Sequence, residues 1–178
     1  MTVVKRKRKE SPFEVFHHLT KMRKDITDLL LRDFGYSNEK FQKNLERKYG
    51  GKPPDQLADI QRQNLERQKK RAEAFDEWFI CQERNVIISC LHRINEHVYT
   101  ANSIYPSCSE ELIERRKHQD LAIGQCYRLV QELQYSIETL PVDVNAYLIF
   151  SEQIQKEIDL IKGWRKSDNK FRKQFEKE

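Results

Sequence analysis

The sequence predicts an all-α fold, namely an antiparallel up-and-down four-helix bundle with a helical insertion between the first and second bundle helices and basic tails. Glycine and proline each number only five in 178 residues, so few residues interrupt long stretches rich in Glu, Lys, Arg, Gln and Leu. Apolar residues recur three and four positions apart in four of these stretches, and none alternates as a strand does. The last three stretches are joined by a few residues each, which favours antiparallel neighbours.

The first bundle helix is expected at residues 11–34. Ser11 and Glu14 have the spacing of a capping box, and Pro12 occupies the first helical position. Gly35 is placed to end the helix. One apolar stripe runs between these signals and consists of Val15, Phe16, Leu19, Met22, Ile26, Leu29 and Leu30.

Residues 35–73 form the predicted insertion. A short helix is expected from about residue 37 to 49, and the run Gly-Gly-Lys-Pro-Pro at 50–54 breaks the chain after it. Residues 55–73 are helix-prone but polar. The sequence leaves open whether they extend the next helix or form a poorly ordered linker.

Residues 74–163 are predicted to supply the other three bundle helices, at 74–102, 109–140 and 143–163. A proline in each connection separates them. Ser107 and Glu110 form a second capping box, and Asp143 is a favourable N-cap for the last helix. The apolar stripe of the first of these helices includes Phe75, Trp78 and Phe79. Residues 164–178 then form a basic C-terminal tail.

The cysteines and the hydropathy indicate a cytoplasmic protein. The cysteines sit singly on helical stretches and form no Cys-x-x-Cys pair, which argues against zinc and favours buried thiols in a reducing compartment. They are Cys81, Cys90, Cys108 and Cys126. The basic run near Met1 lacks the apolar segment of a signal peptide, and no apolar run approaches the ~18 residues that span a bilayer. We therefore expect no membrane contact.

Charge divides the chain into an acidic middle and basic flanks. Residues 74–162 carry 14 Asp and Glu against 8 Lys and Arg, a net charge of −6. The flanks carry +4 in residues 1–10, +2 in 11–49, +2 in 50–73 and +3 in 163–178. A helical body with basic ends is typical of a binding protein that meets a polyanion through its edges, and it does not indicate a catalytic pocket.

Catalytic patterns are weak, so the sequence predicts a protein that is not an enzyme and has no cofactor or metal site. No Glu-x-x-His motif occurs on two helices, and no Gly-rich phosphate loop is present. Glu114 and His118 stand four residues apart on a helix, a spacing more typical of a surface contact than of a ligand set. A helical enzyme with a metal or acid/base site is an alternative hypothesis, which the detection of bound metal in the purified protein would support.

Three basic segments are candidates for nucleic-acid binding. Residues 1–10 are expected to be a disordered arm, whose run of Lys5, Arg6, Lys7, Arg8 and Lys9 suits either nucleic-acid binding or a solvated tail. Arg115, Arg116 and Lys117 form a triplet that reaches a partner or joins a local salt-bridge network. In the C-terminal tail, Trp164 either stacks on a base or closes the end of the bundle. The tail cations that would contact phosphates are Arg165, Lys166, Lys170, Arg172 and Lys173.

Four strings in the chain carry a family resemblance: TANSIYP (100–106), ELIERRKHQDLAIGQC (111–126), QELQYSIETLPVDVN (131–145) and EIDLIKGWRKSDNK (157–170). Together with the four-helix pattern, they resemble the accessory variability determinant proteins, small four-helix-bundle proteins encoded beside the reverse transcriptase of diversity-generating retroelements in phages and bacteria. The resemblance covers roughly residues 74–170, with 11–34 as the first bundle helix. Gly163 and Trp164 followed by basic residues are the most similar part.

This resemblance implies a barrel-shaped homopentamer without catalytic residues. It implies binding to the reverse transcriptase and its template RNA, alone or as an RNA/DNA hybrid, in support of mutagenic complementary-DNA synthesis. The implied contacts to RNA or polymerase are Arg115, Arg116, Arg128, Arg165, Lys166 and Lys170. Family members are basic over the bundle itself, whereas residues 74–162 are acidic here. Nucleic acid would then meet local patches and tails, or the acidic surface would meet a basic polymerase.

A second hypothesis belongs to a different class: an oligomeric helical adaptor or scaffold that binds a protein partner without touching nucleic acid. Ionic strength separates the two hypotheses, because binding driven by phosphate contacts weakens steeply as salt rises. A contact dominated by apolar burial weakens much less. A reverse transcriptase gene next to this one would favour the first hypothesis.

Overall fold

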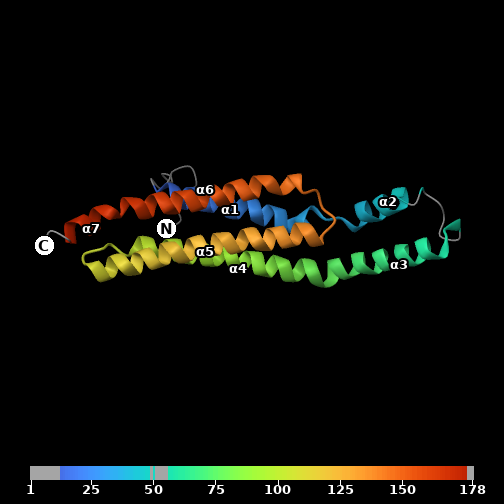
Figure 1. Ribbon diagram of the computed structural model, residues 1–178, viewed down its shortest axis with the longest axis horizontal. Helices are drawn as coiled ribbons and strands as arrows, with labels where there is room; N and C mark the ends of the chain where they lie inside the picture. Colours follow the sequence, from blue (N-terminus) through green and yellow to red (C-terminus); the bar gives the residue numbers. More distant parts are fainter. Residues whose placement is uncertain (1–12, 49, 51–55, 176–178) are drawn as a thin grey trace, which may run out of the picture.

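The computed structural model describes residues 13–48, 50 and 56–175, and every regular element in this part of the chain is helical, which confirms the all-α prediction (Figure 1). The α-helices are α1 (Glu14–Leu31), α2 (Asn38–Lys48), α3 (Asp59–Ala74), α4 (Ile80–Ser103), α5 (Ser109–Thr139), α6 (Asn145–Ser167) and α7 (Asn169–Phe175). A 3-10 turn, η2 (Asp33–Gly35), follows α1, and a π-helical segment, η4 (Phe75–Phe79), joins α3 to α4. Among the helices described, none is long and apolar enough to cross a membrane.

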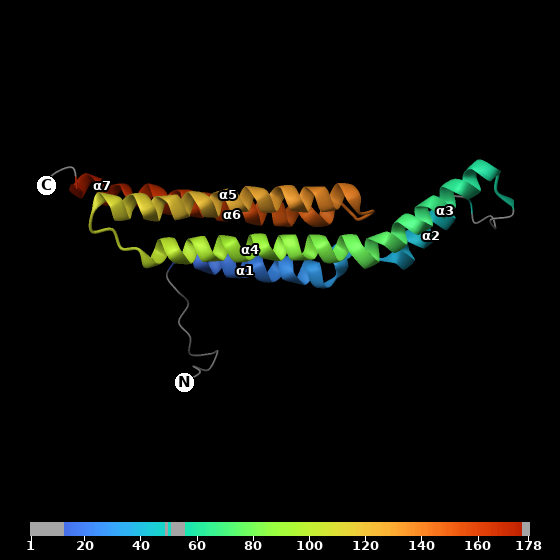
Figure 2. The ribbon, with the colours of Figure 1, turned by 90° about the horizontal axis from the view of Figure 1, so that it is seen from below.

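Helices α1, α4, α5 and α6 lie side by side, and we call them the helical body (Figures 1 and 2). Figure 2 shows α5 and α6 in one layer and α4 and α1 in the other. Contacts run from α1 to α4, from α4 to α5, from α5 to α6 and from α6 back to α1. Residues 104–108 and 140–144 reverse the chain, so α5 is antiparallel to both α4 and α6.

The core of the helical body comes from the apolar stripe of each helix, as expected for amphipathic helices that share one interior. Fully buried side chains face each other from all four helices. They include Leu19, Met22 and Ile26 of α1, Ile87 and Ile94 of α4, Leu129 of α5, and Ile154, Ile158 and Ile161 of α6. Each of these lies on a stripe that the spacing of apolar residues predicts.

Replacing Leu129 with alanine is expected to lower the free energy of unfolding by about 2–5 kcal/mol, because the side chain is fully buried and its removal leaves a cavity. Urea denaturation followed by circular dichroism measures the change. Leu121→Ala is the matched control, since Leu121 lies on the same helix but is 41% exposed. Its cost should be well below that of Leu129→Ala, and equal costs would contradict this description of the core.

Helices α2 and α3 pack on each other and project beyond the helical body, and we call them the arm (Figures 1 and 2). The arm has a small apolar cluster of its own, formed by Leu45, Leu57 and Leu65 with Phe41 against it. Helix α3 runs through η4 into α4, so the polar stretch that the sequence leaves open is an extension of the next helix. Figure 2 shows α3 tilted away from the axis of α4, a bend that a π segment explains.

Several predicted helix ends differ from those observed. Helix α1 starts at Glu14 and ends at Leu31, and the predicted Ser11 capping box lies outside the described residues. Before α5, the Ser107 amide and hydroxyl both donate to Glu111 Oε2 at 2.7 Å, so the partner is Glu111 and not the predicted Glu110. These bonds lower the pKa of Glu111. Before α6, the N-cap is Val144 and not the predicted Asp143. Asp143 Oδ1 still accepts a hydrogen bond from the Asn145 amide at 3.0 Å, one of the amides that a first helical turn leaves open.

The C-terminal region is helical well past the predicted end at residue 163. Helix α6 continues to Ser167, and α7 follows after the single residue Asp168. Helix α7 contacts α5 and α6 through the buried side chain of Phe171. The basic tail predicted at 164–178 is therefore a structured part of the molecule as far as residue 175.

Candidate nucleic-acid interface

A buried ion pair fastens the junction between α6 and α7 to α5. Asp168 is 1% exposed and accepts hydrogen bonds from Arg115 Nε at 2.8 Å and Arg115 Nη2 at 3.2 Å. Gln119 Nε2, one turn further along α5, donates to the same carboxylate at 2.8 Å. Arg115 Nη1 also donates to the Ile104 carbonyl at 2.6 Å. One guanidinium thus joins α5, the α4–α5 connection and the α6–α7 junction.

Trp164 is half-buried beside this ion pair. The guanidinium carbon of Arg115 lies 4.9 Å from the centre of the indole ring, within cation–π range. Phe13 packs edge-on against the Trp164 ring, with ring centres 4.8 Å apart. Trp164 therefore closes this end of the helical body, which is one of the two roles considered for it. Arg115 is 9% exposed and bonded within the chain, so its role here is structural.

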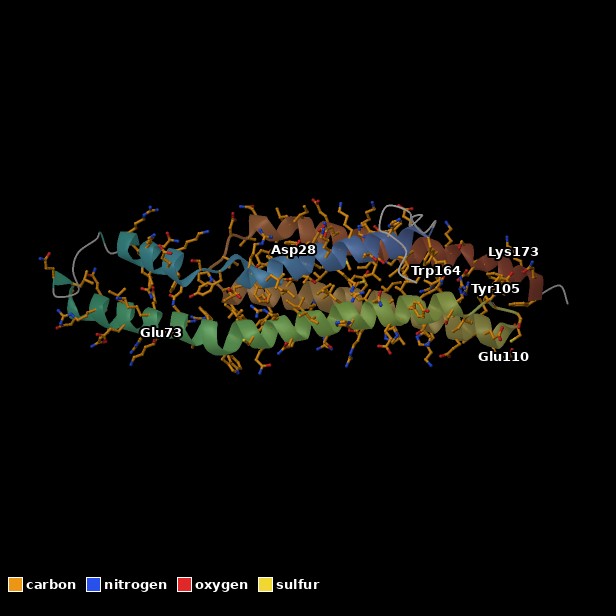
Figure 3. The ribbon with its side chains drawn as sticks, turned by 180° about the vertical axis from the view of Figure 1, so that it is seen from behind. Asp28, Glu73, Tyr105, Glu110, Trp164 and Lys173 are labelled. Carbon is orange, nitrogen blue, oxygen red and sulfur yellow. The ribbon has the colours of Figure 1, made fainter. Side chains whose placement is uncertain are left out.

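The same end of the helical body contains a hollow of 680 Å³ with aromatic and polar walls. Its walls include Phe13, Asn102, Tyr105, Trp164, Lys170 and Phe171. Figure 3 shows Trp164, Tyr105 and Lys173 at this end, opposite the arm that carries Glu73. Tyr105 is 77% exposed and packs edge-on against Phe171, with ring centres 5.5 Å apart. Exposed rings beside cations suit flat, anionic ligands such as nucleotides.

Three lysines form what we call the C-terminal basic face. Lys166, Lys170 and Lys173 follow one another at intervals of four and three residues, so they point to the same side of the α6–α7 segment. All three are exposed. Asp168 and Phe171 lie on the opposite side and are buried against α5. The buried contacts thus hold the segment in place, and the exposed Lys170 places its Nζ 4.9 Å from the centre of the Phe171 ring.

Several of the other candidate cations in the described part are bonded to neighbouring side chains. Arg116 donates to Asn169 Oδ1 at 2.5 Å, and Arg165 forms an ion pair with Asp120. Arg128 donates to Glu132 at 3.3 Å, midway along α5 and away from the α7 end. Lys117 contacts Glu114 at 3.3 Å, so the basic triplet does enter a local network. Arg172 borders a second, smaller hollow of 320 Å³ together with Ile113 and Phe175.

The N-terminal candidate cations lie outside the described residues: Lys5, Arg6, Lys7, Arg8 and Lys9. The described chain begins at Phe13, four residues after Lys9. Phe13 contacts Trp164 and also packs edge-on against Phe16, with ring centres 5.0 Å apart. The chain therefore enters α1 beside the hollow and the C-terminal basic face.

A buried acid on α6, Glu157, contacts a histidine on α1, His18. Neither residue was indicated by the sequence. Glu157 is fully buried, and its Oε2 lies 2.8 Å from His18 Nδ1 while its Oε1 has no hydrogen-bond partner. Burial raises the pKa of Glu157 to about 8. Burial, followed by the charges of Lys156 and Lys21, lowers the pKa of His18. Near neutral pH the pair is therefore expected to share one proton and carry no net charge.

A pair of histidines, His97 on α4 and His118 on α5, joins these two helices. His97 Nδ1 and His118 Nδ1 are 3.3 Å apart, and His118 Nε2 is 3.3 Å from Glu114, the partner that the sequence spacing indicated. Burial and the neighbouring His118 lower the pKa of His97. Across the described residues, no group of three or more His, Cys, Asp or Glu is arranged to hold a metal ion. Cys90 and Cys126 are buried, whereas Cys81 is exposed, so the expectation of buried thiols is wrong for Cys81.

Comparison with known proteins finds no matching family model, no matching curated protein and no matching solved structure. The resemblance to accessory variability determinant proteins accordingly stays a hypothesis. Functional inference therefore depends on the charges, aromatic rings and hollows of the molecule itself.

Sequence reasoning missed two features of this interface. Asp168 and Gln119 were not singled out, although they anchor the segment that carries the basic face. Asp168 is the one acid within the basic run from Arg165 to Lys173, and an isolated acid in such a run is a signal for a buried partner. Trp78, which belongs to the predicted apolar stripe, is 64% exposed and so lies outside the core.

Proposed function

We propose that the helical body is an up-and-down four-helix bundle with the arm as its insertion, and that the protein is a non-catalytic, cytoplasmic RNA-binding accessory protein. The observation that carries this proposal is the C-terminal basic face. Lys166, Lys170 and Lys173 project from one side of a helical segment whose other side is anchored by Asp168 and Phe171. Cations on a fixed surface meet phosphates at a smaller entropic cost than cations on a mobile tail.

The N-terminal basic run supports the same location for the RNA contact. Phe13 touches Trp164, and Lys9 precedes Phe13 by four residues. Four residues of chain span at most ~14 Å, since an extended chain covers about 3.5 Å per residue. Lys9 is thereby tethered near the C-terminal basic face, and the two basic segments can bind the same polyanion.

The polymerase partner follows from the family resemblance and from charge. We propose that a reverse transcriptase contacts the acidic middle of the chain, residues 74–162, which carries a net charge of −6. Nucleic-acid polymerases present basic surfaces, and opposite charge steers such encounters. Co-purification from the native host, with protein and nucleic acid both analysed, tests this. Recovery of a reverse transcriptase together with a defined RNA is the expected result.

Replacing Lys166, Lys170 and Lys173 with glutamine is expected to weaken binding to single-stranded RNA about tenfold or more at low salt. The plot of log affinity against log salt should also become shallower by about 2, since each phosphate contact to a single strand contributes ~0.7. Fluorescence anisotropy with a labelled oligonucleotide across a salt series measures both quantities. Helix content should stay unchanged, because the three side chains are exposed.

The matched control replaces Lys21, Lys24 and Lys156 with glutamine. These lysines are also exposed and lie on the helical body, and their replacement removes the same total charge as the C-terminal variant. If the control lowers affinity and salt slope as much as the C-terminal variant does, binding depends on net charge alone and the C-terminal basic face is not the site.

An oligomeric adaptor is the second candidate, and the exposed apolar side chains of α5 and α6 favour it. They are Ile113, Leu121, Tyr127 and Tyr135 on α5 and Leu148 and Ile149 on α6. Burying such residues is what stabilises an interface between copies. The homopentamer implied by the resemblance would use such a surface. Light scattering coupled to size exclusion gives the subunit number, and co-purification of a protein partner without RNA would favour the adaptor.

A further inference from the structure

Trp78 is a large aromatic side chain left in solvent at the junction of the arm and the helical body. It is 64% exposed, although Phe75 and Phe79 on either side of it are 7% and 4% exposed. Its ring centre lies 6.4 Å from that of the buried Phe79, and most of the indole is exposed to solvent. A supported but exposed indole is a contact surface and not a part of the packing.

The π-helical segment η4 explains why Trp78 faces outward. In this segment the Ile80 amide bonds to the Phe75 carbonyl, five residues back, so the turn holds about one residue more than an α-turn. Phe75 and Phe79 remain on the buried side, whereas residue 78 rotates away from the stripe on which its spacing from Phe75 would place it. Such π segments occur often at functional sites.

The outer side of α3 is basic and leads toward Trp78. Leu65 and Ala72 mark the side of α3 that is buried in the arm. At 100° per residue, Arg67 and Lys70 point to the opposite side and Arg71 lies on one flank, and all three are exposed. The guanidinium carbon of Arg71 lies 5.6 Å from the centre of the Phe75 ring, which places it at the start of η4. Among the acidic residues of α3, Asp59 lies toward the outer side in the first turn, and Glu66 and Glu73 lie on the flank opposite Arg71.

We propose that Trp78 and the outer side of α3 form a second contact for single-stranded RNA. The indole stacks on an unpaired base, while Arg67, Lys70 and Arg71 neutralise phosphates on the adjoining strand. Single-stranded nucleic acid fits this chemistry because stacking needs a base with a free face. This inference rests on the proposed function in that RNA is the ligand, but it assigns a separate site with its own residues.

The two contacts are far apart, which gives the inference a length dependence. Helix α4 has 24 residues and separates η4 from the end that bears the C-terminal basic face, a distance of ~36 Å at 1.5 Å per residue. An RNA that is too short to span this distance occupies one contact at a time. A longer RNA engages both, and its second contact forms at a high effective concentration.

The test uses labelled oligouridines of 6 and 30 nucleotides with the full chain. Trp78→Ala is expected to weaken binding of the 30-nucleotide strand at least fivefold without changing the salt slope, since stacking is not ionic. Arg67→Gln with Lys70→Gln should weaken it and lower the salt slope by about 1.4. The matched controls are Tyr99→Ala, which removes an exposed aromatic side chain from α4, and Lys21→Gln with Lys24→Gln. The controls should bind within twofold of the unaltered protein.

The outcomes separate this inference from the proposed function. Loss of affinity in the Trp78 and α3 variants, with controls unaffected and a larger effect on the longer strand, supports the second contact. If these variants behave like their controls while the Lys166, Lys170 and Lys173 variant loses binding, the second contact is wrong and the proposed function stands. If no variant changes RNA binding, both fail. Circular dichroism on each variant establishes that a loss is not caused by unfolding.

Discussion

Arg115→Ala is expected to lower the free energy of unfolding by about 3–5 kcal/mol. The guanidinium makes two hydrogen bonds to Asp168, which is 1% exposed, and one to the Ile104 carbonyl. Removing it leaves a buried carboxylate with Gln119 as its remaining partner among these contacts. Because the penalty comes from an uncompensated buried charge, its size is well above that of a surface ion pair.

Urea denaturation measures this prediction, with Arg116→Ala as the matched control. Arg116 is the next residue on α5 and donates to Asn169, but its contact is on the surface, so we expect a cost of about 0–1 kcal/mol. Arg115→Lys should restore only part of the stability, since an ammonium cannot bond both carboxylate oxygens as the planar guanidinium does. Equal costs for Arg115→Ala and Arg116→Ala would contradict the structural role assigned to the buried pair.

The second large effect is a loss of stability between pH 6.5 and 8, caused by the buried pair of His18 and Glu157. Burial raises the pKa of Glu157 from its ordinary value of 4.5 to about 8. Between these values the folded chain holds a proton that the unfolded chain releases, so folding stability falls as pH rises. His18 has a lowered pKa, so its contribution to stability rises with pH up to its ordinary value of 6.5 and is constant above it.

The two contributions oppose each other below pH 6.5, and only the fall from Glu157 remains above it. At about 1.4 kcal/mol per pH unit, stability should decrease by about 2 kcal/mol between pH 6.5 and 8. Glu157→Gln should remove this decrease, since an amide cannot ionise. Urea denaturation at half-unit pH steps measures it, and Glu152→Gln, an exposed position on the same helix, is the control that should keep the slope. A Glu157→Gln protein with an unchanged pH slope would refute the assignment.

The helical class and most of the core were predictable because each depends on local information. Stripes of apolar residues at intervals of three and four include Leu19, Ile94, Leu129 and Ile154, and all four are fully buried. Pro106 and Pro141 mark the connections after α4 and α5. The polar extension at 55–73 was undecided because helix propensity alone does not fix a helix without burial. In the structure, Leu65 and Ala72 supply that burial.

The interface was less predictable because it depends on contacts between residues far apart in sequence. Arg115 and Asp168 are separated by 53 positions, and nothing in their spacing indicates that they meet. The exposure of Trp78 follows from a single π turn, which a 3.6-residue period does not anticipate. The predicted helix ended at residue 163, but a glycine at this position costs a helix only about 1 kcal/mol, and α6 continues through it to Ser167.

The contact between Phe13 and Trp164 also determines where appended sequences go. Helix α1 begins and α7 ends in the same half of the molecule, beside the hollow, while the arm lies at the opposite end. A fusion partner or an affinity label at either terminus therefore crowds one pole and leaves the arm accessible. Immobilising the protein by a terminus presents the arm to solution, whereas attachment through the exposed thiol of Cys81 on α4 leaves the opposite pole open.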